Sequence, residues 1–547
     1  MNARAYDAAA HARQFREGGW WTDTTVDAMF AAAVARFADK AALVAYRADR
    51  PADEQPPRFT YAELDRLVAR AAGGMRALGV GAGDVVAVQL PNWWQFVVSV
   101  LACSRIGAVV NPLMPIFRER EMRFMLEFSV ARMLIVPKLF RGFDHGEMGM
   151  ALKAALPSLA HVIAVDDPGD AGFDAMLRRG EGREVEFDRA ARRPADVMSV
   201  LMFTSGTTGE PKGVMHCDNT LIACTDALAA CFKLDSDEAL LCCAPLGHMT
   251  GYAAVMLQSL RLGSTLVLQD VWDPKRAVRI LADDGITYTA AAAPFLADIC
   301  EAVAAGGPKP PRLKKFLCGG APIPPVLIER AAREIDLGVS SLWGMTESLA
   351  STLTPPERAA EKSASTDGRA LDGVEVRVVD DGGRPVTLGQ TGRLEVRGTQ
   401  MFLGYYKRPD IKTFDGDGWF DTGDLAYMDA EGFIRINGRT KDVLIRGGEN
   451  VPVFEIESLL HRHAAVAAAA VVGYPDSRLG ERACAFIVAR PGMNFALSDL
   501  QAWMAECKVA KQYWPERVEL LPELPRTPSG KIQKFVLRDR AKAFALE

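Results

Sequence analysis

The residues best suited to chemistry lie in one stretch of small and hydroxylated residues within residues 201–216. A β-rich run at 198–203 leads into Thr204, Ser205, Gly206, Thr207, Thr208 and Gly209, and Lys212 follows. The glycines allow sharp turns that expose backbone N–H groups, the hydroxyls add donors, and the lysine adds positive charge. The stretch therefore predicts a loop that cradles a polyphosphate. It is not a Walker A loop, because Pro211 precedes Lys212 and Gly213 follows it.

Four further segments place aromatic, acidic and basic residues among glycines, always after this loop. They read Ser341-Leu-Trp-Gly-Met-Thr-Glu-Ser348, Gly418-Trp-Phe-Asp-Thr-Gly-Asp424, Gly438-Arg-Thr-Lys-Asp442 and Pro525-Arg-Thr-Pro-Ser-Gly-Lys531. In this order the five segments resemble the signature motifs of the adenylate-forming superfamily, which includes acyl-CoA synthetases, adenylation domains of peptide synthetases and luciferases. Several motifs in order are far more specific than any one of them.

The resemblance implies an enzyme that joins a carboxylic acid to coenzyme A through an acyl-AMP intermediate, using ATP and Mg²⁺. It implies a catalytic set of Lys531, Thr346, Glu347 and His248. Thr346 would contact the α-phosphate and Glu347 would hold Mg²⁺, for which a hard oxygen ligand is suited. Lys531 would neutralise charge between the two reacting anions. Taken alone, Glu347 and Lys531 would each be an ordinary solvated side chain, and His248 a satisfied structural histidine.

The remaining positions that the resemblance assigns surround the nucleotide and coenzyme A. Asp424 and Arg439 would contact the ribose. Lys441 would be the hinge of a mobile domain, and Gly447 and Gly448 would let the pantetheine arm pass close to the backbone. The other nucleotide-binding positions are Gly320, Ala321, Pro322, Trp343, Gly344, Met345 and Asn450.

The candidates for the acyl pocket are largely apolar: His248, Met249, Tyr252, Ala292, Ala293, Gly320 and Met345. They include no obvious cation for a second carboxylate. Segments 92–96, 111–121 and 448–455 resemble a subgroup of short- and medium-chain acyl-CoA synthetases that includes cyclohexanecarboxylate-CoA ligases. We therefore expect an apolar monocarboxylic acid, such as cyclohexanecarboxylate, a short- or medium-chain fatty acid, or an aryl acid.

Several other activities share these motifs. An acyl-AMP ligase that loads a carrier protein shares every adenylation motif, but the sequence runs only from Lys531 to Glu547 after the last of them, which favours free coenzyme A. A luciferase-like oxygenase uses the same scaffold. An inactive acyl-AMP or nucleotide sensor is disfavoured by the presence of Lys212, Glu347, Asp424, Arg439 and Lys531.

The elements that must position these residues alternate along the chain. Between about residues 60 and 350, short β-rich runs alternate with helical segments, which predicts α/β architecture with helix-wrapped sheets. Short strands near 370–440 predict a small β-barrel or meander, and a mixture of helix and strand follows. The expected fold is therefore α/β plus α+β. An N-terminal domain of 1–440 would precede a mobile C-terminal domain of 441–547.

Composition excludes several other classes of protein. The net charge of −5, from 64 basic and 69 acidic residues, argues against a nucleic-acid binder. Ten cysteines without a C-x-x-C pair suit a reducing, cytoplasmic location. The uncharged stretches 85–104 and 240–260 contain proline and polar residues, so we expect no membrane span. The expected partners are a small carboxylic acid, ATP and coenzyme A, and a homodimer is left open.

Overall fold

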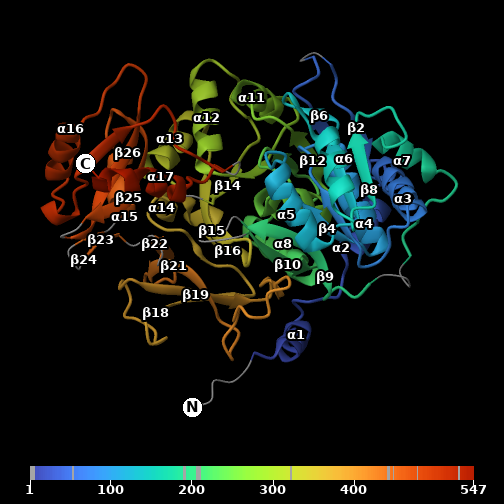
Figure 1. Cartoon of the computed structure of the whole chain (residues 1–547), viewed down its shortest axis with the longest axis horizontal. Coiled ribbons are helices and arrows are strands. Elements are labelled where there is room, and N and C mark those ends of the chain that lie inside the picture. The colour runs from blue at the N-terminus through green and yellow to red at the C-terminus, as the bar shows by residue number, and fades with distance from the viewer. Residues whose placement is uncertain are drawn as a thin grey trace.

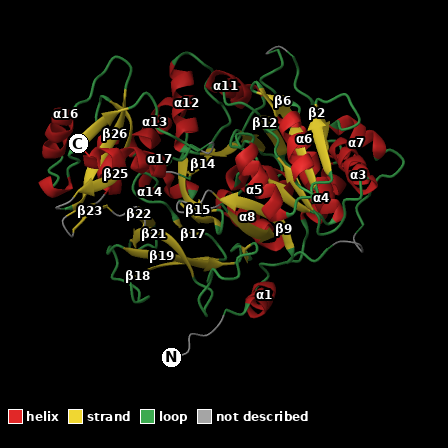
Figure 2. Ribbon diagram, viewed as in Figure 1, coloured by secondary structure: helices red, strands yellow, loops and turns green. Residues whose placement is uncertain are grey.

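A computed structural model describes residues 6–51, 54–188, 193–204, 211–320, 323–439, 444–446, 449–451, 453–476, 479–527 and 530–546. Two large sheets form the N-terminal body, a small sheet lies beside them, and a mixed unit contains the C-terminus (Figure 1). The helices and strands alternate through the body, as Figure 2 shows. The predicted α/β body with a smaller C-terminal unit is confirmed.

The first large sheet has nine strands and is parallel at its centre. In spatial order they are β17 (Arg369–Ala370), β16 (Leu349–Leu353), β15 (Val339–Met345), β14 (Lys315–Gly319), β13 (Tyr288–Ala291), β11 (Ala239–Cys242), β12 (Thr265–Gln269), β1 (Ala41–Tyr46) and β2 (Arg58–Thr60). The central strands are short apolar runs, as strands covered by helices on both faces require. Their buried outer face packs on α11 (Pro274–Asp283), α12 (Ala293–Ala304) and α13 (Pro325–Ile335).

The second large sheet has seven strands. Their order is β20 (Gly404–Tyr405), β10 (Lys212–Cys217), β9 (Met198–Thr204), β4 (Val109–Pro112), β3 (Val85–Val88), β5 (Met133–Pro137) and β8 (His161–Val165). Its outer face packs on α5 (Glu119–Ser129) and α6 (His145–Ala155). The strands on either side of the predicted phosphate loop, β9 and β10, therefore belong to this sheet.

The largest apolar core lies between the two sheets. It is filled from α2 (Val26–Phe37), α3 (Tyr61–Ala77), α4 (Trp94–Ile106), α7 (Phe173–Arg179), α8 (Asp218–Phe232), the π-helix η1 (Tyr252–Leu257) and α10 (Gln258–Leu262). Helix α3 begins at a capping box, in which the Thr60 hydroxyl accepts from the Glu63 N–H and the Glu63 carboxylate accepts from the Thr60 N–H. Helix α4 ends at Gly107, whose φ of 76° is the left-handed conformation that glycine adopts without strain.

Shorter elements connect these layers. They are α1 (Ala8–Glu17), the β6–β7 hairpin (Leu139–Phe140 and Phe143–Asp144), α9 (Met249–Gly251), α14 (Ala359–Lys362) and the 3₁₀ helix Pro356–Arg358. The uncharged stretches at 85–104 and 240–260 are a strand followed by helices, as predicted. In the part of the chain that the structure describes, no helix is both long and apolar enough to cross a membrane.

The strands predicted near 370–440 are present, but they form an open sheet. The antiparallel order is β18 (Val374–Val379), β19 (Gly392–Gly398), β21 (Phe420–Met428) and β22 (Ile434–Arg439). Among the described residues, the edge strands β18 and β22 do not pair with each other. Of the two predicted arrangements, a small barrel or a meander, the described strands form the meander, and strand periodicity alone does not encode whether the two edges meet.

The C-terminal unit has one mixed sheet with helices on both faces. Its strands are β24 (Glu449–Val451), β23 (Leu444–Arg446), β26 (Gly480–Ala489), β25 (Val466–Asp476) and β27 (Arg517–Leu520). Helices α15 (Val453–His461) and α16 (Leu497–Glu506) pack on one face, and α17 (Lys534–Ala541) packs on the other. The 3₁₀ helices Lys511–Tyr513 and Lys542–Leu546 complete it.

His145, the first residue of α6, gives the fold a pH-dependent contribution to stability. Its side chain is fully buried, edge-on to Phe143, with Nδ1 3.4 Å from Gln89 Oε1. Burial, and then the charge of Arg118, lowers the pKa of His145 to about 4. Below pH 6.5 the unfolded chain binds a proton that the folded chain does not, so stability falls as the pH drops toward 4.

We expect the free energy of unfolding to lose up to about 1.4 kcal/mol per pH unit from this histidine across that window. Urea denaturation of the unmodified chain and of His145→Gln, each at pH 7 and pH 5, measures the difference. The variant should show the shallower pH dependence. Equal slopes for the two chains would contradict the assignment.

Candidate active site

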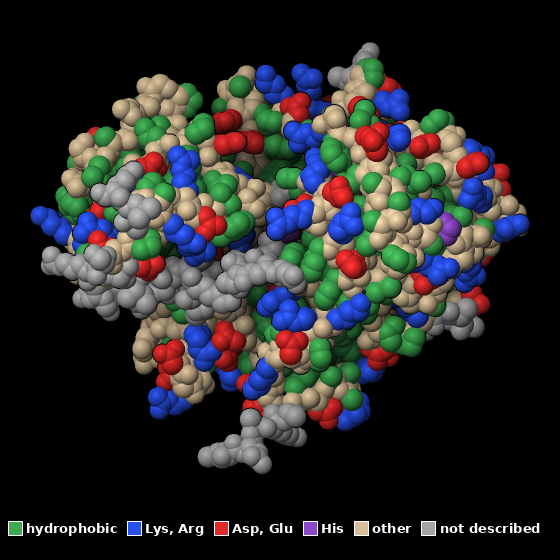
Figure 3. All heavy atoms as spheres, in the orientation of Figure 1, with side chains coloured by type: hydrophobic (Ala, Val, Ile, Leu, Met, Phe, Trp, Pro, Cys, Tyr) green, Lys and Arg blue, Asp and Glu red, His purple; other side chains and the backbone are tan. Residues whose placement is uncertain are grey.

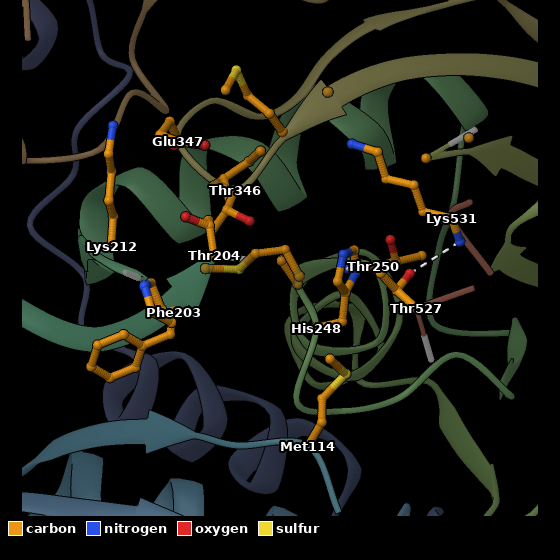
Figure 4. Close-up of a pocket in the computed structure, with 18 of the residues that line it drawn as sticks. Met114, Phe203, Thr204, Lys212, His248, Thr250, Thr346, Glu347, Thr527 and Lys531 are labelled. Atoms are coloured by element: carbon orange, nitrogen blue, oxygen red, sulfur yellow. Dashed lines mark hydrogen bonds between the residues drawn. The ribbon is translucent and has the colours of Figure 1, made fainter. Parts of the chain in front are cut away.

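A cavity of about 1040 Å³ lies where the two large sheets, the four-stranded sheet and a C-terminal loop meet. Several Lys and Arg side chains lie along the junction between the C-terminal unit and the body (Figure 3). Of the residues that the sequence singled out, the following line the cavity: Thr204, Lys212, His248, Met249, Ala292, Gly320, Gly344, Met345, Thr346, Glu347 and Lys531. Figure 4 shows Thr204, Lys212, Thr346 and Glu347 on one side and His248 and Lys531 on the other.

Thr346 and Glu347 lie in the tight turn between β15 and β16. The turn closes with a hydrogen bond from the Ser348 N–H to the Met345 carbonyl, and Leu349 takes a left-handed φ of 54°. Such a conformation is uncommon for a bulky residue and persists only where surrounding contacts hold it. The turn therefore carries a threonine hydroxyl and a carboxylate to the cavity wall on a constrained backbone.

Two side chains from the other large sheet hold this turn. The Tyr405 hydroxyl donates to Glu347 Oε1 at 2.8 Å, and the Glu347 side chain is largely buried. His216 Nε2 lies 2.7 Å from the Thr346 carbonyl, which can only accept, so Nε2 is the donor. Burial lowers the pKa of His216 to about 4, so the ring is neutral and its Nδ1 faces the Thr220 hydroxyl at 3.0 Å.

Lys531 reaches the cavity on a compact loop of the C-terminal unit. The Thr527 N–H donates to the Lys531 carbonyl at 2.7 Å, and the Lys531 N–H donates to the Thr527 hydroxyl at 3.0 Å. Gly530 has a φ of 86°, and a Cβ atom there would lie 3.6 Å from both Ala292 and Pro294 at the start of α12. The loop thus lies directly against the body, and the Lys531 side chain extends toward Thr346 (Figure 4).

His248 lies beside this loop at the start of α9. Its Nδ1 accepts a hydrogen bond from the Thr250 N–H at 3.2 Å. Burial, and then the charge of Lys531, lowers the pKa of His248 to about 4. The ring is therefore neutral near pH 7 and carries its proton on Nε2, which makes it a hydrogen-bond donor and not a cation.

Trp343 and Asp424 form a buried pair outside the cavity wall. The indole N–H donates to Asp424 Oδ2 at 2.9 Å, and only 3% of Asp424 is exposed. Leu342 and Gly344 line the cavity, so Trp343, between them on β15, faces the other side of the strand. One carboxylate oxygen of Asp424 is thus taken by the indole. The adenine and ribose contacts proposed for this pair remain predictions.

Two of the acyl-pocket candidates, Tyr252 and Ala293, do not line the cavity. Tyr252 is fully buried and packs edge-on against Phe96, at 6.5 Å between ring centroids. Ala293 belongs to the core on the outer face of the nine-stranded sheet. The π-helix that begins at Tyr252 changes which residues face the cavity, and Ala253 and Ala254 line it instead.

Several predicted positions lie outside the described residues, so their roles remain predictions: Ser205, Gly206, Thr207, Thr208, Gly209, Ala321, Pro322, Lys441, Gly447 and Gly448. For Arg439 and Asn450 the structure gives the backbone, at the ends of β22 and within β24.

The sequence reasoning missed the apolar part of the cavity wall. The lining residues contributed by α8, η1, β14 and β16 are all apolar or glycine: Cys224, Ala253, Ala254, Leu317, Gly319, Leu349 and Ala350. Leu349 and Ala350 come just after Glu347 and Ser348, at the start of β16, and this position could have revealed them. It also missed Tyr405 and His216, whose contacts with the turn cross from one sheet to the other.

Comparisons with known proteins match nearly the whole chain. A family described as AMP-binding enzyme matches residues 30–406, and its C-terminal domain family matches residues 455–531. The chain is 34% identical to the medium-chain fatty-acid–CoA ligase of Escherichia coli (strain K12), over 96% of the chain and 92% of that protein.

A second relative is the 3-[(3aS,4S,7aS)-7a-methyl-1,5-dioxo-octahydro-1H-inden-4-yl]propanoyl:CoA ligase of Mycobacterium tuberculosis (strain ATCC 25618 / H37Rv). It is 36% identical over 94% of the chain and 98% of that protein. Among solved structures, ATP-bound MatB from Rhodopseudomonas palustris superposes with a TM-score of 0.83 at 26% identity, covering 95% of the chain and 100% of MatB.

Proposed function

Because the chain belongs to the AMP-binding enzyme family, as an AMP-forming acyl-CoA ligase, we propose that it activates an apolar monocarboxylic acid. The favoured acids are cyclohexanecarboxylate and short- or medium-chain fatty acids, with aryl acids as the alternative. The supporting observation is the apolar part of the cavity wall, where Ala253, Ala254, Leu317 and Ala350 surround the space in which an acyl group would lie. The names of the two relatives describe acids whose bulk is largely apolar, a fatty acid and a fused-ring propanoate.

In the first step, a carboxylate oxygen of the acid attacks the α-phosphorus of ATP, and the bond to pyrophosphate breaks. Two anions must approach each other in line, so the enzyme has to neutralise charge and fix geometry. Thr204, Lys212 and Thr346 supply donors on one side of the cavity, and Lys531 supplies positive charge on the other. His248, neutral and with its proton on Nε2, would orient the carboxylate at the entrance to the apolar wall.

The site suits Mg²⁺ bound mainly through the phosphates of ATP. Mg²⁺ commonly binds one or two carboxylates together with substrate phosphates and water. Glu347 offers one buried carboxylate at the cavity wall, and the described residues contain no group of three or more His, Cys, Asp or Glu arranged to hold a metal. Glu347 would hold the ion, which would neutralise charge on the leaving phosphates.

In the second step, the thiol of coenzyme A attacks the acyl carbonyl and AMP leaves. We propose that the unit beginning near Lys441 rotates for this step, withdrawing Lys531 and bringing Gly447 and Gly448 to the cavity. Asn450 and Arg439 would contact the nucleotide. The boundary between 1–440 and 441–547 follows from this proposal.

A homodimer stays a prediction, and a cytoplasmic location is supported by ten cysteines that form no disulfide.

A panel of acids tests the substrate class. With ATP and Mg²⁺, cyclohexanecarboxylate, hexanoate, octanoate and benzoate should each give coenzyme A-dependent release of AMP, at least tenfold above glutamate or succinate, since the apolar wall offers no partner for a second charge. Chromatography of the AMP and the thioester measures both products. Preference for a dicarboxylate or an amino acid would overturn the proposal. Acid-dependent AMP formation without a free CoA thioester would favour the carrier-loading alternative.

A further inference from the structure

The two halves of the nucleotide site come from different sheets, so their relative position depends on contacts between those sheets. The flanks of the phosphate loop, β9 and β10, belong to the seven-stranded sheet, whereas the Thr346–Glu347 turn ends a strand of the nine-stranded sheet. A segment of five residues, 402–406, contacts both. We call it the strap.

The strap is joined to the phosphate-loop side through its backbone. Val214 pairs with Tyr405 and Met215 with Gly404 as β10 and β20. The Leu403 N–H donates to the Met215 carbonyl, and the Tyr406 N–H donates to the Gly213 carbonyl, both at 2.8 Å. Movement of β10 would therefore carry the strap with it.

The strap contacts Glu347 through both the backbone and the side chain of that residue. The Phe402 N–H donates to the Glu347 carbonyl at 2.9 Å, and the Tyr405 hydroxyl donates to Glu347 Oε1 at 2.8 Å. Hydrogen bonds to ionised acceptors are stronger than those between neutral groups. This contact is also shielded from water, since only 9% of Tyr405 is exposed.

The same tyrosine ring faces the phosphate-binding cation. Lys212 Nζ lies 4.7 Å from the centroid of the Tyr405 ring, within the range of a cation–π interaction. Figure 4 shows Lys212 and Glu347 on the same side of the cavity although they come from different sheets. Tyr405 thus touches both the lysine expected at the phosphates and the carboxylate expected at the metal.

We propose that Tyr405 is a positioning residue that fixes the Glu347 carboxylate for the metal–nucleotide complex, with Lys212 held against the same ring. This inference rests on the proposed function, in which Glu347 holds Mg²⁺. Groups that orient metal ligands through hydrogen bonds commonly contribute 10–100-fold to metal affinity.

Tyr405→Phe removes a single oxygen and leaves the ring, the strand pairing and the Lys212 contact in place. The test is a titration with Mn²⁺, followed by electron paramagnetic resonance, of the enzyme saturated with a non-hydrolysable ATP analogue. The affinity for Mn²⁺ should fall about 10–100-fold, whereas the affinity for the analogue without metal should stay within about twofold. Tyr406→Phe is the matched control, because it removes the hydroxyl of the next strap residue, whose ring packs on Phe128.

A double-mutant cycle separates positioning from general loosening. In a Glu347→Gln background, Tyr405→Phe should have little further effect on Mn²⁺ affinity, because the charged group that it positions is gone. Equal Mn²⁺ affinity in Tyr405→Phe and the unmodified enzyme would overturn the proposal. So would additive losses in the cycle, or an equal loss of metal-free analogue binding. The Mn²⁺ titration contains no carboxylic acid substrate, so it would still test the role of Tyr405 if the acid panel failed.

Discussion

Replacing Lys531 with alanine is expected to lower acid-dependent exchange of pyrophosphate into ATP by about 10²–10³-fold, the usual effect of removing one charge-stabilising group from a reaction centre. The loop that carries Lys531 lies against Ala292 and Pro294, and its side chain extends toward Thr346. In the proposed reaction, this charge would lie where the acid's carboxylate and the α-phosphate meet. The side chain is exposed and lines the cavity, so its loss should leave the fold intact.

Lys542→Ala supplies the matched control. Lys542 lies eleven positions later, in the 3₁₀ helix Lys542–Leu546, where its ammonium group pairs with Asp539 at the surface. The Lys542→Ala variant should exchange pyrophosphate at the rate of the unmodified chain, and both variants should melt within about 2 °C of it. Unchanged exchange in Lys531→Ala would remove Lys531 from the chemistry of the first step. Hydrolysis or thiolysis of added acyl-AMP should be far less affected by either substitution, because the adenylate is already formed.

Filling the apolar part of the cavity should change which acids are accepted. Ala350, on β16, is 7% exposed and lines the cavity beside Leu349. In Ala350→Phe, kcat/KM for cyclohexanecarboxylate and octanoate should fall by about 100-fold or more, since the added ring occupies the acyl space. For propionate, which does not reach that far, the decrease should be about threefold or less.

Ala350→Val gives an intermediate case, with a graded loss that follows acid size. Overpacking costs about 1–3 kcal/mol where the space is already filled, so the melting temperature of each variant shows whether the cavity accepts the added atoms. Steady-state kinetics on the three acids provide the measurement. An equal loss for propionate and octanoate would mean that Ala350 does not face the acyl group.

The sequence predicts those parts of the site that depend on short segments. The composition of the phosphate loop predicts its chemistry directly, whereas the Thr346–Glu347 turn and the Lys531 loop are found because each short segment resembles a family motif. The strands on which they lie follow from short apolar runs between glycine and proline. Thr204, Lys212 and Thr346 meet at one cavity because β9, β10 and β15 have their ends at neighbouring places in the two sheets, and Lys531 reaches the same cavity from the C-terminal unit.

Contacts that cross between sheets leave no local pattern. Tyr405 lies 58 positions from Glu347, and His216 lies 130 positions from Thr346; neither neighbour is marked by composition or periodicity. Tyr252 shows a different limit, since it follows His248 and Met249 closely in the sequence but does not line the cavity. A π-helix begins at this residue and turns its side chain into the core.

In the proposed reaction, this cavity joins AMP to an apolar carboxylic acid. Exchange of labelled pyrophosphate into ATP by the unmodified chain, with and without cyclohexanecarboxylate or octanoate and in the absence of coenzyme A, tests it most directly. The exchange should require both Mg²⁺ and the acid. Absence of exchange with every apolar acid offered, from a folded protein that binds ATP, would contradict it.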